Sequence, residues 1–126
     1  MRIELVSTQP DGSKNWIDCR EEIKGRDIFA VNEAAEVEQG QDDQGQGMTK
    51  ISYLALEDKQ RIALLAQVIT AWSFQVPIPN GNVAAARSVI GDLGAADYRK
   101  LRAEVAPLLA EVRSNDLPDP KPPVTS

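Results

Sequence analysis

Carboxylates are the residues of this chain that could do chemistry, because histidine is absent and Cys19 is the single cysteine. Glu33 and Glu36 share one face of an expected helix, and Glu57 and Asp58 lie where another helix is expected to begin. Acidic pairs of this kind are typical of a solvated helix surface, so neither pair predicts general acid–base catalysis. Without histidine, the chain has no base for a serine or cysteine nucleophile and lacks the usual ligand of a catalytic zinc site. We therefore expect a binding protein and not an enzyme.

The glycine-rich segment 39–48 contains Asp42 and Asp43, a pair of carboxylates that could suggest calcium binding. The segment lacks the loop length and the terminal glutamate of an EF-hand. No Gly-Lys-Ser or Gly-Lys-Thr sequence follows its glycines, so it is not a phosphate-binding loop either. Cys19 has acidic neighbours that disfavour its thiolate, and we interpret it as a packed side chain. The sequence thus predicts no metal site and no cofactor.

Length and charge indicate the class of protein. The 126 residues predict one domain, and 42% of them are apolar, as in an ordinary globular chain. Residues 1–48 carry five bases against eleven acids, a net charge of −6, whereas residues 49–126 carry nine bases and eight acids. An acidic N-terminal part repels phosphates and anionic lipids, which argues against nucleic-acid and membrane-surface binding. The chain has no long apolar run and no signal-peptide pattern, so we expect a location in the cytoplasm.

Residues 1–20 are expected to form a β-hairpin. Ile3 and Leu5 alternate with polar neighbours, as in a strand with one buried face. Residues 9–12 have the composition of a turn, because proline presets φ, aspartate can bond to its own backbone and glycine tolerates a positive φ. Two strands alone are marginal in water, so the hairpin must pack on another part of the chain.

Helices are expected in most of the remaining chain. The first is predicted over residues 27–37 with Asp27 as its N-cap, and the polar segment 39–48 after it is predicted to be a flexible loop. A second, strongly apolar helix is predicted over residues 57–74, ended by the prolines at 77 and 79.

Two further helices are predicted over residues 83–93 and about 95–113, so that residues 57–113 form a helical part. The second of them is expected to carry one apolar face, made by Leu101, Val105, Leu108, Leu109 and Val112. The Pro-rich residues 115–126 are predicted to be a disordered tail. The expected fold class is mainly α, of the α+β type, with an N-terminal β-hairpin followed by about four helices. We expect a single small domain over residues 1–114.

The apolar helix also supplies the candidate partner-binding residues. Between residues 62 and 74 its only polar side chains are spaced by three, so they form one narrow stripe on an apolar helix. Such a helix is either buried on most of its circumference or serves as an interface. The interface interpretation assigns partner contacts to Leu65, Ile69, Trp72 and Phe74, and the alternative is that these four side chains form the core.

Several motifs resemble small proteins encoded by tailed phages of actinobacteria. Residues 16–21 (W-I-D-C-R-E) and 24–27 (K-G-R-D) resemble the "W-x-D-L-R-E … G-x-D-R" opening of those proteins. Residues 66–74 (A-Q-V-I-T-A-W-S-F), followed by P-I-P at 77–79, resemble their "W-S-F/L … P-I-P" segment. Cys19 stands where the pattern has leucine. The resemblance spans about residues 1–113 and is to the tail assembly chaperones of long-tailed, siphovirus-like phages.

This resemblance implies a non-enzymatic role in the host cytoplasm. Tail assembly chaperones coat the long helical tape measure protein while the tail is built and are absent from finished particles. The implied partner is therefore the tape measure protein or another phage tail protein. The chain could also associate with further copies of itself, as a homo-oligomer, or with a longer frameshifted form of itself. For such a frameshift, codons for residues 119–121 (D-P-K) can contain the slippery sequence C-CCA-AAG.

Two other classes of function remain open from the sequence. A virion structural protein, such as a head–tail connector or a minor tail component, would use the same hairpin and helices for permanent symmetric contacts. An acidic regulator or inhibitor would use the negative N-terminal part to imitate nucleic acid, although bases at positions 20, 24 and 26 interrupt that charge.

Overall fold

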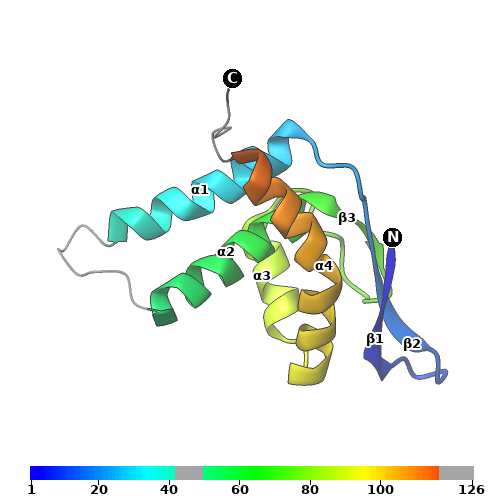
Figure 1. The fold of residues 1–126 in the computed structure, drawn as a ribbon. Coiled ribbons are helices and arrows are strands. Elements are labelled where there is room, and N and C mark those ends of the chain that lie inside the picture. The colour runs from blue at the N-terminus through cyan, green and yellow to red at the C-terminus, as the bar shows by residue number, and fades with distance from the viewer. Residues whose placement is uncertain (42–49, 117–126) are drawn as a thin grey trace.

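The computed structural model describes residues 1–41 and 50–116, which contain three strands and four helices (Figure 1). In chain order these are β1 Arg2–Thr8, β2 Lys14–Cys19, α1 Gly25–Gln41, α2 Lys50–Val68, β3 Ile69–Trp72, α3 Val83–Gly91 and α4 Ala95–Asp116. The fold class is α+β with an N-terminal β-hairpin followed by helices, which confirms the prediction. The predicted flexible loop from residue 42 and the predicted tail from residue 117 lie outside the described residues.

The three strands form one antiparallel sheet in the order β1-β2-β3. Ile3 on β1 and Ile17 on β2 are paired and both are buried, because alternate residues of a strand face opposite sides of the sheet. In the turn between these strands, Asp11 Oδ1 accepts a hydrogen bond of 2.9 Å from the backbone N–H of Ser13. Gly12 there has a φ of +91°. Both features confirm the predicted turn.

The prediction of one helix over residues 57–74 is wrong at its C-terminal end. α2 stops at Val68, and the next four residues form β3, which pairs with β2 at one edge of the sheet. Hence the predicted helical part, residues 57–113, contains a strand. Helical periodicity extends through this run because no breaker precedes Pro77, but its β-branched and aromatic residues also suit a strand. A third strand stabilises a hairpin that would be marginal by itself.

Three carbonyl groups in the last turn of α2 find partners outside the helix. Ala66 O accepts a hydrogen bond of 2.7 Å from Gly81 N–H, and Val68 O accepts one of 2.8 Å from Arg20 N–H. Gln67 O accepts a bond of 3.1 Å from the guanidinium group of Arg20. The end of a helix leaves carbonyls without intrahelical partners, so these tertiary bonds allow α2 to end here.

The first helix begins earlier and ends later than predicted. Asp27 is not its N-cap but lies inside the first turn of α1, where its carboxylate accepts a hydrogen bond of 2.8 Å from Lys24 N–H. This backward bond satisfies a backbone donor at the entrance of the helix, as in a capping box. Because α1 reaches Gln41, the first residues of the predicted loop 39–48 are helical.

The last two helices follow the sequence pattern closely. The side chain of Asn82 accepts a hydrogen bond of 3.0 Å from Ala85 N–H and thereby caps α3. α4 remains one helix across Pro107 and extends to Asp116, so the first two residues of the predicted tail are helical. The predicted apolar face of α4 is buried and consists of Leu101, Val105, Leu108, Leu109 and Val112.

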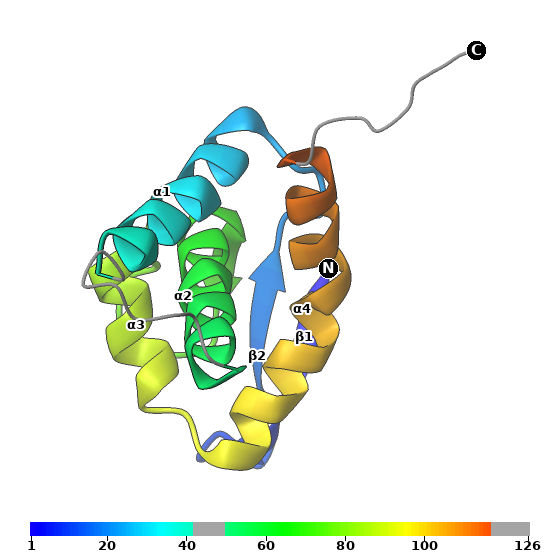
Figure 2. The same ribbon diagram turned by 60° about the vertical axis from the view of Figure 1, so that its left-hand side comes forward.

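α2 occupies the middle of the fold, with α1 and α3 on one side and the sheet and α4 on the other (Figure 2). Leu64, Leu65 and Val68 on α2 have no exposed surface, because helices or strands cover them on all sides. None of the helices in residues 1–41 and 50–116 combines the length and the apolar composition needed to cross a membrane.

A buried ion pair joins β2, α1 and α2. The side chain of Asp27 is 0% exposed, and its two oxygens accept hydrogen bonds of 2.9 and 3.0 Å from Arg20. Burial alone would raise the pKa of Asp27, but the hydrogen bonds from Arg20 and from Lys24 N–H outweigh burial and hold this pKa below its ordinary value. The carboxylate is therefore charged in the folded protein at neutral pH.

Replacing Asp27 by Asn should lower the free energy of unfolding by about 3 kcal/mol at pH 7, because it leaves the Arg20 charge buried without its partner. Since folding depresses the pKa of Asp27, its contribution is present above the pKa of an unfolded aspartate and is lost as the pH falls through the folded pKa. Urea unfolding of both proteins between pH 7 and pH 3 measures this. The difference in the free energy of unfolding between the original chain and the Asp27→Asn variant should become smaller as the pH falls.

Asp92→Asn is the matched control, because Asp92 is an exposed carboxylate at the end of α3. We expect this change to leave stability within about 0.5 kcal/mol of the original chain. Equal stability of the Asp27→Asn variant and the original chain at pH 7 would contradict the role of the ion pair.

Candidate functional site

The four residues assigned to partner contacts lie in or against the core. Leu65 is 0% exposed, Ile69 3% and Trp72 8%. The Trp72 indole N–H donates a hydrogen bond of 2.8 Å to Val76 O, and its ring meets the ring of Phe74 edge-on at 5.4 Å between centroids. Phe74 is half-buried and packs against the core from outside. The structure thus has the packing that the core interpretation describes, and contact of these residues with a partner stays a prediction.

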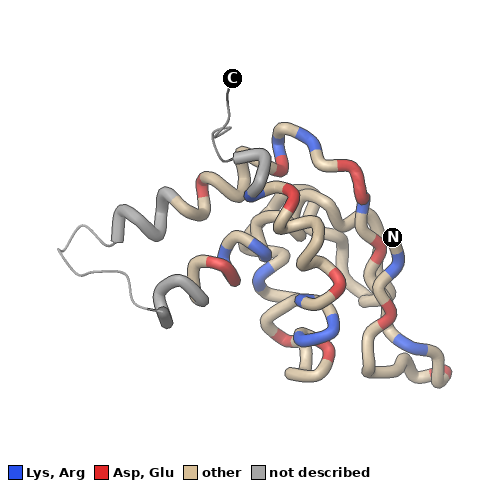
Figure 3. Tube along the Cα trace, in the orientation of Figure 1, with Lys and Arg blue, Asp and Glu red and all other residues tan. Residues whose placement is uncertain are grey.

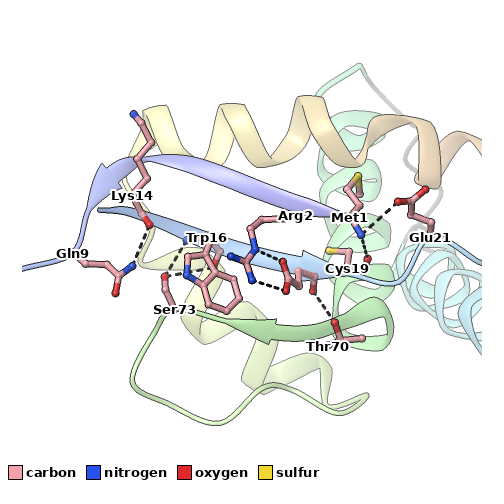
Figure 4. Close-up of polar contacts among 10 residues, drawn as sticks. Met1, Arg2, Gln9, Lys14, Trp16, Cys19, Glu21, Thr70 and Ser73 are labelled. Atoms are coloured by element: carbon pink, nitrogen blue, oxygen red, sulfur yellow. Dashed lines mark hydrogen bonds and ion pairs between the residues drawn. The ribbon is translucent and has the colours of Figure 1, made fainter. Parts of the chain in front are cut away.

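The outer face of the sheet carries the other tryptophan. Trp16 is half-buried on β2, and the guanidinium of Arg2 lies 3.9 Å from its ring centroid (Figure 4). The same guanidinium donates two hydrogen bonds, of 2.8 and 3.0 Å, to the carboxylate of Asp18. Backbone N–H of Trp16 donates to the hydroxyl oxygen of Ser73 at 2.9 Å. These groups tie the three strands together on their exposed side.

The carboxylate pairs of the sequence are surface or structural groups where the structure describes them. Asp58 accepts hydrogen bonds from Arg61 and, at 2.8 Å, from the hydroxyl of Tyr98. Burial and the neighbouring Asp58 raise the pKa of Tyr98, so its hydroxyl keeps its proton at neutral pH and acts as a donor. Glu57 pairs with the buried Arg61 at 3.6 Å, and Glu33 is exposed.

Asp97 has a role that sequence analysis did not reveal. Its Oδ1 accepts hydrogen bonds of 2.7 and 2.9 Å from the backbone N–H groups of Val6 and Ser7, so the start of α4 closes the edge of β1. Burial by itself would raise the pKa of Asp97, but these hydrogen bonds outweigh it and lower the pKa. An aspartate near a helix start carries no signal for a bond to a strand about ninety residues away.

Cys19 and the carboxylates do not form a metal site in the part of the chain that the structure describes. No three His, Cys, Asp or Glu side chains gather there closely enough to hold an ion. Cys19 is buried on β2, and burial raises its pKa to about 12. Asp42 and Asp43 lie outside the described residues.

Two hollows on the helical side of the molecule are the best candidate for a functional surface. The α1–α3 hollow has a volume of about 230 Å³ and a floor of small apolar residues, Ala30 and Ala34 on α1 and Ala63 on α2. Its other lining residues are Val83 and three charged residues, Glu33, Lys59 and Arg87.

The α3–α4 hollow lies next to the first and has a volume of about 430 Å³. Ile62 on α2, Ile90 on α3 and Leu93 after α3 provide its apolar surface, and Asp58 and Tyr98 provide its polar side. Because Asp58 and Tyr98 are bonded to each other and to Arg61, this polar side is already satisfied within the protein.

Arg87 on α3 lines both hollows. Its side chain is exposed and makes no hydrogen bond or ion pair with any other residue that the structure describes. Arg20, Arg61 and Arg113 differ in this respect, since each of them pairs with a carboxylate. Charges of both signs follow α1, α2 and α4 (Figure 3), and Lys59 shares the α1–α3 hollow with Arg87.

Comparison with protein-family models, with curated proteins and with solved structures finds no match to this chain.

Cys19 should resist thiol reagents in the folded protein at pH 8, because its pKa of about 12 and its burial leave almost no accessible thiolate. Reaction with a disulfide reagent, followed by absorbance, should be slow in buffer and fast in strong urea. Labelling in buffer as fast as that of a small thiol would contradict the burial of Cys19.

Trp72→Ala should lower the free energy of unfolding by about 3–5 kcal/mol, because it removes a large side chain from the core. Phe74→Ala should lower the free energy of unfolding by a smaller amount, since Phe74 is only half-buried. Denaturant unfolding of both variants measures the difference. Unchanged unfolding of Trp72→Ala together with loss of partner binding would instead make Trp72 a contact residue.

Proposed function

We propose that this chain is a tail assembly chaperone of a long-tailed actinobacterial phage. It binds the tape measure protein in the host cytoplasm, keeps it soluble while the tail is built, and performs no chemistry. The observation that supports this proposal best is the pair of apolar hollows on a small, largely helical domain, beside Arg87, which has no partner among the described residues. Its motif resemblance to such chaperones supplies the biological context.

A tape measure protein is a long helical chain that presents apolar surface until the tail tube encloses it. Exposed apolar surface of that size aggregates unless another protein covers it. Concave, apolar surfaces bind amphipathic helices by taking up side chains that recur along one helix face. The hollows at α2 and α3 offer such a surface, and the charged groups around them keep the uncovered chaperone soluble.

The polar groups near these hollows favour binding over catalysis. Asp58, Arg61 and Tyr98 are hydrogen-bonded to one another, and the raised pKa of Tyr98 makes its hydroxyl a donor and not a base. A catalytic site normally holds a titratable group poised to exchange a proton with the substrate. These three residues instead hold α2 against α4.

The proposal is tested by peptide mass spectrometry on infected cells and on purified phage particles from the same culture. Peptides of this chain should be abundant in the cells and absent from the particles. Peptides that continue past residue 126 in another reading frame would add support for a frameshifted form. Stoichiometric peptides in the particles would overturn the chaperone proposal and favour a virion structural protein.

A second test follows solubility. Co-expression of the full chain with the tape measure protein of the same phage should move the tape measure protein from the pellet to the soluble fraction. The control is co-expression of the tape measure protein with an unrelated acidic protein of similar size, which should leave it in the pellet. Equal solubility in both cases would contradict the proposal.

A further inference from the structure

We infer that the two hollows form one groove for an amphipathic helix of the partner, in which a partner carboxylate pairs with Arg87 between two apolar side chains. This inference rests on the proposed function, since the helix would belong to the tape measure protein, and it adds where and by what chemistry that helix binds.

The two hollows meet on one stretch of α2. Asp58 and Ile62 line the α3–α4 hollow, while Lys59 and Ala63 line the α1–α3 hollow. Residues three and four positions apart are neighbours on a helix surface, so these four positions form one continuous patch. Arg87 contributes to both hollows and therefore stands where they join.

The spacing along α3 matches the repeat of a partner helix. Val83 and Arg87 line one hollow, and Arg87, Ile90 and Gly91 line the other. From Val83 to Gly91 the helix rises by about 12 Å, at about 1.5 Å per residue. Apolar side chains at positions i and i+7 of a partner helix lie about 10 Å apart along its axis, so each could enter one hollow.

Charge determines what lies between those two apolar side chains. A partner residue at i+3 or i+4 would face Arg87, which has no partner among the described residues. An acidic residue there gains a charge-assisted hydrogen bond, whereas a basic residue there is repelled. Two acids line the groove, Asp58 and Glu33. Asp58 is already bonded to Arg61 and Tyr98, so its charge opposes the partner carboxylate less. Glu33 is exposed, so solvent and salt screen its charge.

The hollows also differ in size, and this difference determines which partner side chain fits which hollow. The α1–α3 hollow, with its alanine floor, is about half as large as the α3–α4 hollow, with its isoleucines. A partner helix fits both hollows if it places a small apolar side chain in the α1–α3 hollow and a large one in the α3–α4 hollow.

The test uses synthetic peptides of about 20 residues, long enough to form a helix. One carries Val at position i, Glu at i+4 and Leu at i+7 in an alanine-rich, soluble background, and its twin carries Lys in place of Glu. Fluorescence anisotropy measures the binding of each labelled peptide to the full chain. The original chain should bind the Glu peptide about tenfold more tightly than the Lys peptide.

Arg87→Glu should reverse this preference, because the central charge of the groove changes sign. Arg99→Glu is the matched control, since Arg99 is exposed on α4 and lines neither hollow, and it should keep the original preference. Ala34→Trp should abolish the binding of both peptides by filling the α1–α3 hollow. Thermal unfolding of each variant checks that the fold is retained.

Three results would overturn the inference: no binding of either peptide by the original chain, no reversal in Arg87→Glu, or the same loss in Arg99→Glu. A concentration-dependent dimer that Arg87→Glu abolishes would also overturn it, because a second copy of the chain would then occupy the groove. Analytical ultracentrifugation of the chain without peptide detects that dimer.

The groove and the chaperone function can fail separately. If Arg87→Glu keeps the tape measure protein soluble as well as the original chain does, the groove is wrong and the chaperone function stands. If the original chain fails to keep it soluble while the peptides bind with the expected preference, the proposed function is wrong and the groove binds a helix of another acidic partner.

Discussion

The fold depends most on the hydrogen bonds and the ion pair that Arg20 makes directly after the end of β2. Its guanidinium holds the buried carboxylate of Asp27 at the start of α1, and it also donates to Gln67 O in the last turn of α2. Its backbone N–H donates to Val68 O, the last residue of that helix. One residue therefore satisfies groups from two helices and directs the chain from α2 into the sheet. A buried pair of this kind adds little net stability over apolar packing, but losing one member is costly.

This constraint explains the position of the apolar side chains that follow. Once α2 ends at Val68, Ile69 and Trp72 lie on a strand, and the sheet carries both of them into the core. The hairpin gains a third strand, and the core gains a tryptophan at its margin beside Phe74. The motif residues that resemble the phage proteins thus have structural roles, with Trp16, Asp18, Arg20 and Asp27 all engaged in contacts within the domain.

The two hollows inferred to bind the partner lie on the surface of the helices and not in the core. Of the side chains that a helical interpretation would place in an interface, Leu65, Ile69 and Trp72 are buried and Phe74 is half-buried. Arg87, which has no distinguishing feature in the sequence, lines two hollows that are each built from three or more segments of the chain. Alanines on α1 and α2 line one hollow, and Leu93 after α3 helps to line the other. Shape and charge at this surface depend on how four helices meet, which explains why sequence analysis did not find it.

The sequence by itself determined the local structure. Alternation predicted the hairpin, the composition of residues 9–12 predicted its turn, and the spacing of Leu101, Val105, Leu108 and Val112 predicted the buried face of α4, because these signals act within a few residues. Tertiary structure decided the end of α2, the bond from Asp97 to β1 and the joining of two hollows at Arg87. Each of these depends on groups far apart in the chain, and a hydrogen bond or a shared surface between them exists only after folding has brought them together.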